Sequence, residues 1–324
     1  MRKGTLAPIL GGAVAAGVVA STILKFYRQR GAADRLWQDT VVERFDEPST
    51  VKELTILPLI DFYTANETLI GEPGVSYLVQ ADDHTVLFDV GFNRKGLNPS
   101  PLLRNMENLG VSREEIDSVV ISHRHVDHTG GFKAQRARSF MLAPDDTEPF
   151  PVRAYVPEEM THPSANVKVV TEPLEIAPGV FSIGPIARSI WLAGMTPEQA
   201  LAVNVAGKGL VLIMGCGHQT LQRAVARTEA LFDEPLYGVI GGLHFPVTGS
   251  RIRGGVQRVI GTGRPPWQFI GKEDVRVTVS FLEEKKPHLV AISAHDSCDW
   301  TIDAFKETFG DRYREVVVGR KIVV

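Results

Sequence analysis

The stretch ISHRHVDHTGG, residues 121–131, places three of the chain's nine histidines and one aspartate within six positions. The run that leads into it, IDSVVIS at residues 116–122, is apolar and β-branched, which predicts a buried strand. The cluster therefore lies where a strand ends and a loop begins, the place where rigid scaffolds carry functional side chains. Imidazole and carboxylate groups are ligands of zinc, iron and manganese. The stretch predicts a metal site, and the alternative is a polar loop without a metal.

The bulk composition excludes several classes of protein. A chain of 324 residues accommodates one large domain or two of ordinary size, and 44% hydrophobic with 23% charged residues is typical of globular proteins. The net charge of −3 gives no electrostatic case for a nucleic-acid partner. Two cysteines, Cys216 and Cys298, are too few for a disulfide framework or a four-cysteine zinc site.

The N-terminus differs from this average, because residues 4–24 carry no charge and are flanked by basic residues on both sides. A helix of that length spans about 31 Å, the thickness of a bilayer core, and small residues before Ser21 would also permit signal-peptide cleavage. We therefore expect residues 1–30 to be a membrane anchor or a signal segment, with a soluble helix as a third alternative, and residues 31–50 to be a linker. The protein would then be membrane-anchored or exported to the periplasm or cell envelope, in an undecided orientation; a cytoplasmic location is less favoured.

Residues 51–324 alternate short apolar strands with helices. Ser100 is expected to cap a helix that ends before Gly110, and Gly207-Lys208-Gly209 predicts the turn of a hairpin over residues 201–215. Further strands are expected at residues 53–60, 75–81, 85–90, 236–240 and 288–293, and further helices at 219–232, 272–285 and 301–309. The pattern predicts one α/β domain in which helices cover buried sheets.

The spacing His123-x-His125-x-Asp127-His128 resembles the HxHxDH signature of the metallo-β-lactamase superfamily, and LFDVG at residues 87–91 resembles its strand-ending LFDTG. Within the superfamily, LVLIMGCGHQTL at residues 210–221 and VIGGLHF at residues 239–245 look like the dihydropterin synthase-like branch. The resemblance implies an αββα sandwich, with two mixed sheets between helical layers and the metals at one edge between the sheets. The chain departs from the branch at residues 295–298, which read HDSC where HCTG is usual.

The resemblance also implies a centre of two divalent metal ions, for which zinc is favoured and iron and manganese are alternatives. The ligands implied for the first ion are His123, His125 and His218, and those for the second ion are Asp127, His128 and His295. Asp89 would hold the histidine loop from behind. Cys216 stands where relatives often have an aspartate, but we leave it out of the ligand set because a small buried cysteine is an equal alternative.

Three further residues are expected to face a substrate. His244 recurs in the branch, although a structural histidine at a strand end is an equal alternative. Residues 249–267 look like an insertion, with four arginines among glycines. A flexible basic loop with Trp267 could close over an anionic substrate through Arg251 and Arg253. The alternative is a solvated or membrane-facing loop.

The function expected from these residues is hydrolysis of a small ester, lactone or phosphoester-like substrate by a hydroxide bound to two metals, with Asp127 as the catalytic proton carrier. An alternative enzyme is a transferase that condenses a pterin diphosphate with an aminobenzene ribofuranosyl phosphate, as the branch name implies. A second alternative is a non-catalytic binding protein tethered to a membrane through residues 4–24. The spacing of the ligands is the same for both enzymes and does not separate them.

Overall fold

A seven-stranded mixed sheet forms the first half of the fold, in the computed structural model that describes residues 6–324. Its strand order is β15-β1-β2-β3-β4-β5-β6, with antiparallel pairing from β15 to β3 and parallel pairing from β3 to β6. The strands are β1 (Leu54–Ile60), β2 (Ser76–Ala81), β3 (His84–Phe88), β4 (Ser118–Val120), β5 (Arg153–Val156), β6 (Asn166–Val169) and β15 (Ile322–Val323).

The second half of the fold repeats this plan in a six-stranded mixed sheet. Its order is β14-β13-β12-β11-β8-β7, with parallel pairing from β14 to β12 and antiparallel pairing from β12 to β7. The strands are β7 (Leu174–Ala177), β8 (Val180–Ser182), β11 (Leu201–Val205), β12 (Gly209–Met214), β13 (Leu236–Gly241) and β14 (Leu289–Ile292). A separate hairpin pairs β9 (Ile186–Ile190) with β10 (Gly194–Glu198).

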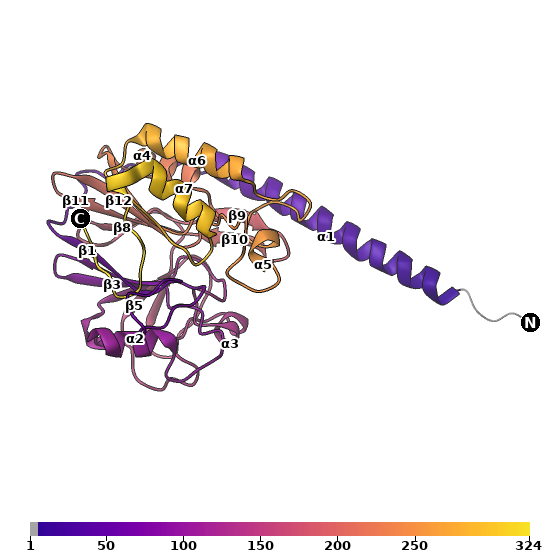
Figure 1. The fold of residues 1–324 in the computed structure, drawn as a ribbon, viewed down its shortest axis with the longest axis horizontal. Coiled ribbons are helices and arrows are strands. Elements are labelled where there is room, and N and C mark those ends of the chain that lie inside the picture. The colour runs from indigo at the N-terminus through magenta and orange to yellow at the C-terminus, as the bar shows by residue number, and fades with distance from the viewer. Residues whose placement is uncertain (1–5) are drawn as a thin grey trace, which may run out of the picture.

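Helices cover the outer faces of the two sheets (Figure 1). One layer contains α2 (Pro101–Leu109) and α3 (Phe132–Arg136), and the other contains α4 (Leu221–Leu231), α6 (Lys272–Lys285) and α7 (Asp299–Phe309). A short helix, α5 (Val256–Val259), lies in a long connection after β13, and two single turns, η1 (Arg113–Glu115) and η2 (Gly310–Arg312), complete the order. Two mixed sheets between helical layers make up the sandwich that the family resemblance implied.

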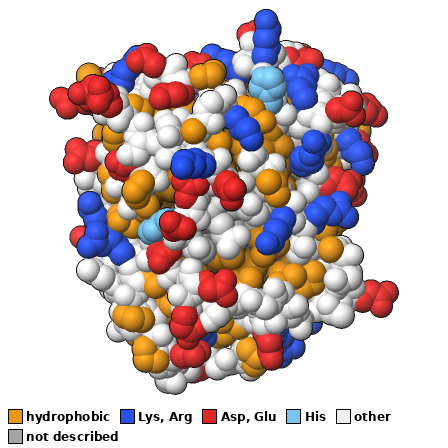
Figure 2. Space-filling view, turned by 90° about the vertical axis from the view of Figure 1, so that its left-hand side faces the viewer, with side chains coloured by type: hydrophobic (Ala, Val, Ile, Leu, Met, Phe, Trp, Pro, Cys, Tyr) orange, Lys and Arg blue, Asp and Glu red, His pale blue; other side chains and the backbone are white. Residues whose placement is uncertain are grey.

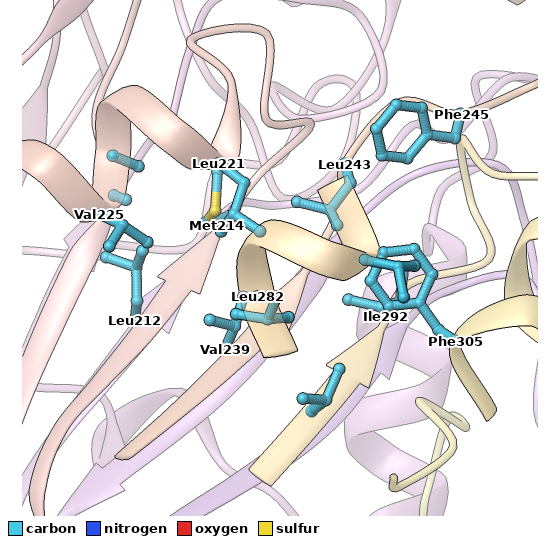
Figure 3. Packing of buried hydrophobic residues seen from close by; sticks show 14 of the residues in the cluster. Leu212, Met214, Leu221, Val225, Val239, Leu243, Phe245, Leu282, Ile292 and Phe305 are labelled. Atoms are coloured by element: carbon cyan, nitrogen blue, oxygen red, sulfur yellow. The ribbon is translucent and has the colours of Figure 1, made fainter. Parts of the chain in front are cut away.

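Three buried apolar clusters fill the spaces between these layers. One lies between the sheets, where side chains such as Val79 and Val211 are buried, and one lies under α2. The third lies between the second sheet and its helices, where Val225 of α4 and Leu282 of α6 pack with strand residues such as Leu212 (Figure 3). The central strands of each sheet are therefore buried on both faces, which explains why they read as continuous apolar runs.

The N-terminal helix, α1 (Leu6–Asp39), corrects two expectations. It continues through residues 31–39, which the sequence predicted to be linker, because its C-terminal half packs on the β9–β10 hairpin with Phe26 and Ala33 buried (Figure 1). Among residues 6–324, no helix combines the length and the apolar character needed to cross a membrane. The predicted anchor and membrane partner at residues 4–24 are therefore not supported; residues 4 and 5 lie outside the described residues.

Local signals in the sequence agree well with the structure. Ser100 accepts a hydrogen bond from the Leu103 N–H at the start of α2, and Gly110 ends the helix at φ 68°. The β11–β12 hairpin turns at residues 206–208. Acidic and basic side chains are interspersed on the face drawn in Figure 2, in keeping with a net charge near zero.

Candidate metal centre

The candidate site lies where the parallel strands of both sheets end. The parallel neighbours β3 and β4 lead into residues 89–91 and into the histidine loop at 121–131. In the other sheet, the parallel strands β12, β13 and β14 lead into residues 215–220, 242–245 and 293–298. Because the carboxyl ends of parallel strands meet at one edge, the five loops converge there.

The first group of converging side chains contains three histidines. His123 Nε2 lies 3.0 Å from His125 Nδ1, and His218 Nε2 lies 3.1 Å from the same atom. Behind them, the His123 Nδ1–H donates to Ser122 Oγ at 2.9 Å, because the Ser122 hydroxyl hydrogen is given to Asp89. The His218 Nδ1–H donates to the Gly261 carbonyl at 2.8 Å. Both Nε2 atoms therefore present lone pairs to the centre.

The second group is built around a cysteine. Cys216 Sγ lies 3.1 Å from His128 Nε2 and 3.3 Å from His295 Nε2, and Asp127 Oδ2 lies 3.8 Å from His128 Nε2. The ligand atoms of these four residues all lie within 4.8 Å of one another. Cys216 also belongs to a group with His123 and His218, so its sulfur lies between the two sets of histidines.

Buried carboxylates fix the rings of this second group. The His128 Nδ1–H donates to Asp89 Oδ2 at 2.7 Å, and Asp89 also accepts the Ser122 backbone N–H and hydroxyl. The His295 Nδ1–H donates to Ser293 Oγ at 2.6 Å, and that hydroxyl donates to Asp61. Asp89 therefore lies behind the histidine loop, and both rings again turn Nε2 inward.

The electrostatics of the centre favour a bound cation. Burial lowers the pKa of His123, His218 and His295 well below the usual value, so these rings are neutral. Burial also opposes a charge on His128, but Asp89 and Asp127 outweigh it and raise the pKa of this ring to about 9. Burial, reinforced by nearby carboxylates, raises the pKa of the Cys216 thiol well above its usual value. The carboxylates of Asp89 and Asp127 thus favour positive charge beside His128 and Cys216.

The donor set fits divalent metal ions. Four imidazoles turn Nε2 inward, and each has its Nδ1–H held by an acceptor behind it. In the three neutral rings, His123, His218 and His295, this Nε2 carries a lone pair, whereas a bound cation would displace the proton of His128. The His125 Nδ1–H and the Cys216 S–H can donate to two of the three lone pairs, so at least one has no donor among the described residues. Nitrogen, sulfur and carboxylate ligands suit zinc, and iron or manganese also accept imidazole and carboxylate.

Two residues that the sequence did not assign complete the centre. Cys216 was left out of the ligand set, yet it contacts ligands of both groups. Glu198, at the end of β10, is fully buried and accepts the backbone N–H groups of Cys216 at 2.9 Å and Gly217 at 2.8 Å. It therefore holds the loop that carries His218. The only sequence signal for Glu198 was a carboxylate next to an apolar strand.

The residues expected to contact substrate have different surroundings. His244 is buried beside His218, with ring centroids 4.9 Å apart, and its Nε2 lies 3.0 Å from the Gln257 carbonyl. The Arg251 guanidinium donates to the Ala294 and Ser297 carbonyls and to Asp299, so the chain itself uses most of its hydrogen bonds. The structure therefore does not support substrate contact by Arg251. Arg253 is exposed, and its role stays a prediction.

The insertion at residues 249–267 packs against the centre instead of lying free over it. The Gly261 carbonyl accepts the His218 Nδ1–H. The Gln257 and Ile260 carbonyls both lie within hydrogen-bond distance of His244 Nε2. The Gln257 side-chain amide donates to the His295 carbonyl at 2.9 Å. The insertion thus forms a wall of the site. A larger cavity, of about 880 Å³, lies elsewhere, between the end of α1 and the β9–β10 hairpin, and contains none of the converging ligands.

Comparison with known proteins agrees with this geometry. The sequence model of the metallo-beta-lactamase superfamily matches residues 69–140, which include the histidine loop and Asp89. Residues 69–140 therefore match the metallo-β-lactamase superfamily, as the HxHxDH signature predicted.

Two characterised relatives have different activities. The chain is 23% identical over 240 residues to the 7,8-dihydropterin-6-methyl-4-(beta-D-ribofuranosyl)-aminobenzene-5'-phosphate synthase of Methanocaldococcus jannaschii, covering 60% of this chain and 78% of that enzyme. It is 23% identical over 194 residues to an N-acyl homoserine lactonase of Bacillus cereus, covering 51% of this chain and 75% of the lactonase. Relatives of the chain thus include a synthase and a hydrolase.

Solved structures share the fold. A crystal structure of a metal-dependent hydrolase of the β-lactamase superfamily aligns with a TM-score of 0.58 at 21% identity, over 84% of this chain and 99% of that one. The metallo-β-lactamase fold protein YhfI of Bacillus subtilis aligns with a TM-score of 0.51 at 14% identity, over 84% of this chain and all of its own, 100%. At these identities the likeness extends to the fold alone.

Proposed function

We propose that this protein is a metal-dependent hydrolase of a small ester, lactone or phosphoester-like substrate, with a centre of two divalent ions. The observation that carries the proposal is the convergence of two ligand groups on Cys216, with the outer nitrogens of their histidines held by acceptors. A plain polar loop does not require four imidazoles whose Nδ1–H groups are all held by acceptors with Nε2 turned inward.

The residues divide into two ligand sets that share the cysteine. His123, His125 and His218 would hold one ion, and Asp127, His128 and His295 the other, with Cys216 between them. Two divalent ions in such a site lower the pKa of a water molecule and polarise the carbonyl or phosphoryl oxygen of a substrate. Zinc suits this mixture of nitrogen, oxygen and sulfur, and iron and manganese are alternatives.

The chain itself supplies positioning and proton transfer. The Asp127 side chain is 13% exposed, whereas His128 beside it is fully buried, so Asp127 lies at the mouth of the centre. One of its carboxylate oxygens can take a proton from the attacking water and pass it to the leaving group. Asp89 and Ser293 keep the His128 and His295 rings in the tautomer that leaves Nε2 free.

A dihydropterin synthase-like transferase is the second candidate, and the similarity to the Methanocaldococcus jannaschii synthase favours it. In that reaction the same residues would face a departing diphosphate instead of a water molecule. The hydrolase stands first because residues 295–298 and the wall at 249–267 depart from the branch where a substrate would lie. Export from the cytoplasm remains a prediction from the sequence.

Metal content and turnover test both candidates. Elemental analysis of purified protein should find about two divalent ions per chain, and His123→Ala with His125→Ala should remove most of them. His288→Ala, an exposed histidine stacked on Tyr237, is the matched control and should change nothing. A panel of lactones, carboxylic esters and phosphodiesters, run beside the pterin condensation assay, then separates hydrolase from transferase. Condensation without hydrolysis would replace the first candidate by the second, and undiminished metal in the double variant would refute both.

A further inference from the structure

A cavity of about 240 Å³ shares a wall with the metal centre. It lies between the first turn of α4, the N-terminal half of α6 and residues 261–264 of the insertion. His218 and His244 form the shared wall, and Arg188 from β9 lines the cavity next to Gly263. Neither the proposed ligand sets nor the proposed proton transfer uses this space.

Arg188 has no hydrogen-bond or ion-pair partner within residues 17–324, whose side chains the structure describes, although it is half-buried. Other arginines nearby are satisfied: Arg264 pairs with Asp274, Arg223 with Asp34, and Arg227 donates to the Ile183 carbonyl. A guanidinium carries five N–H donors, and leaving it half-buried without an acceptor is unfavourable. The described side chains therefore supply no acceptor for the Arg188 guanidinium.

The neighbouring charges also affect the Arg188 guanidinium. Burial, reinforced by the positive charges of Arg223, Arg30 and Arg264, lowers the pKa of Arg188 to about 10, so the group remains protonated at neutral pH. The one carboxylate that opposes this effect, Asp34, is already bound to Arg223. The guanidinium of Arg188 therefore lines the cavity as a protonated donor without a carboxylate of its own.

Further donors line the same cavity. Thr220, Leu221 and Gln222 form the first turn of α4, an eleven-residue helix whose N-terminal end carries a positive partial charge. Thr262, on the insertion side, also lines the cavity. The two carboxylates of the lining are engaged, since Asp274 binds Arg264 and the Glu273 carboxylate pairs with Arg276. Arg188 is therefore the charged group of the lining that is left without an ion-pair partner among the described side chains.

We propose that this cavity is a binding site for an oxyanion, namely a phosphate, sulfate or carboxylate group, held by Arg188 and the first turn of α4. The group can belong to the substrate or to a free anion, and the substrate assignment rests on the proposed hydrolase. The anion site itself does not, because none of its residues belongs to the ligand sets except His218 in the shared wall.

Calorimetric titration of the full chain with inorganic phosphate and with sulfate tests the site, after metals are removed with a chelator. Arg188→Gln should weaken phosphate binding about tenfold or more, as expected when a charge-assisted hydrogen bond is lost. Arg153→Gln, which changes an exposed arginine of the other sheet, should bind phosphate as the wild type does. Arg188→Lys keeps the charge without the fork and should be intermediate.

Thermal unfolding provides a second measurement. Arg188→Gln should raise the Tm of the anion-free protein, because it removes an unpaired charge, and phosphate should raise the Tm of the wild type only. No binding by the wild type at millimolar phosphate, or equal binding by wild type and Arg188→Gln, would overturn the site.

Kinetics with the metal-loaded protein assign the source of the anion. If phosphate competitively inhibits hydrolysis of a carboxylate-bearing ester, and inhibits Arg188→Gln less than the wild type, the cavity binds the substrate's own anionic group. Phosphate binding without competition assigns it to a free anion. Absence of any hydrolysis would count against the proposed function but would leave the calorimetric result on the anion site standing.

Discussion

Replacing Asp89 by asparagine tests how the centre is held together. Asp89 Oδ2 accepts the His128 Nδ1–H and the Ser122 hydroxyl, each at 2.7 Å, and Oδ1 accepts the Ser122 backbone N–H, also at 2.7 Å. Asparagine has one acceptor oxygen in place of two. If that oxygen faces His128, the amide NH₂ faces the Ser122 N–H, donor against donor. If the amide is turned, His128 must carry its hydrogen on Nε2, where it points at Cys216.

Either orientation removes a support of the second ligand group while it keeps the size of the side chain. Losing such an outer partner of a ligating histidine typically weakens metal affinity by about 10- to 100-fold. That is a loss of about 1.4 to 2.8 kcal/mol of binding free energy. We expect the loss at one of the two ions, because His123, His125 and His218 keep their own contacts except through Ser122.

The assay is competition for zinc between metal-free protein and a chromophoric chelator, with stoichiometry checked by elemental analysis. Asp82→Asn is the matched control, because Asp82 also follows a strand and accepts backbone N–H groups, from Lys52 at 2.9 Å and Glu53 at 2.8 Å, but far from the centre. An Asp89→Asn protein whose second ion binds within about threefold of the wild type would refute the reasoning, since that is under 1 kcal/mol. Equal losses in both variants would also do so.

Four further substitutions address other parts of the site and of the insertion. Cys216→Ser should abolish the sulfur-to-metal charge-transfer band of cobalt-substituted protein, and an unchanged band would exclude the thiolate as a ligand. Burial raises the pKa of Glu198 from 4.5 to about 7, so this group stabilises the fold below pH 4.5 and that contribution is lost as pH rises through 7. Urea unfolding of the metal-free protein should therefore show that the free energy of unfolding of the wild type falls by about 3 kcal/mol more than that of Glu198→Gln as the pH rises from 4.5 to 7. The same dependence of the unfolding free energy on pH in both proteins would contradict this prediction. Arg251→Ala should lower the free energy of unfolding by about 2 kcal/mol without a selective rise in KM for anionic esters, whereas Arg253→Ala should not change stability.

Features that depend on near neighbours in the chain could be predicted from the sequence. The histidine loop holds four candidate ligands within six positions, and its place after a strand follows from the apolar run before it. The Ser100 cap and the Gly110 stop of α2 are equally local, since each acts within one helical turn. The pairing of His218 with the first group, and of His295 with the second, came from the family resemblance, because no local rule brings residues 90 or more positions apart together.

Features that depend on which loops meet could not be predicted. A cysteine after a strand reads equally as a small core residue, and only the approach of His128 and His295 to its sulfur distinguishes Cys216. Arg251 reads as a cation in a glycine-rich loop, but the 294–299 segment supplies its acceptors across the fold. The N-terminal run reads as an apolar segment with a linker after it, whereas the hairpin against which the helix packs extends it to Asp39.

The insertion gives the clearest case of a sequence feature with the opposite structural meaning. Its glycines and arginines suggested a mobile flap, yet Gly261 adopts φ 112° so that its backbone can approach the His244 ring, where any Cβ would collide. The Gly261 carbonyl accepts the Nδ1–H of His218, on the side of the ring that faces away from the centre. At its far end, Trp267 packs edge-on against Trp191 of the segment between β9 and β10, and Trp191 packs edge-on against Phe26 of α1. Gly261 thus allows the backbone to approach an imidazole ring closely and does not indicate a mobile loop. The insertion also connects the N-terminal helix, through Trp191, to the His218 and His244 rings at the centre.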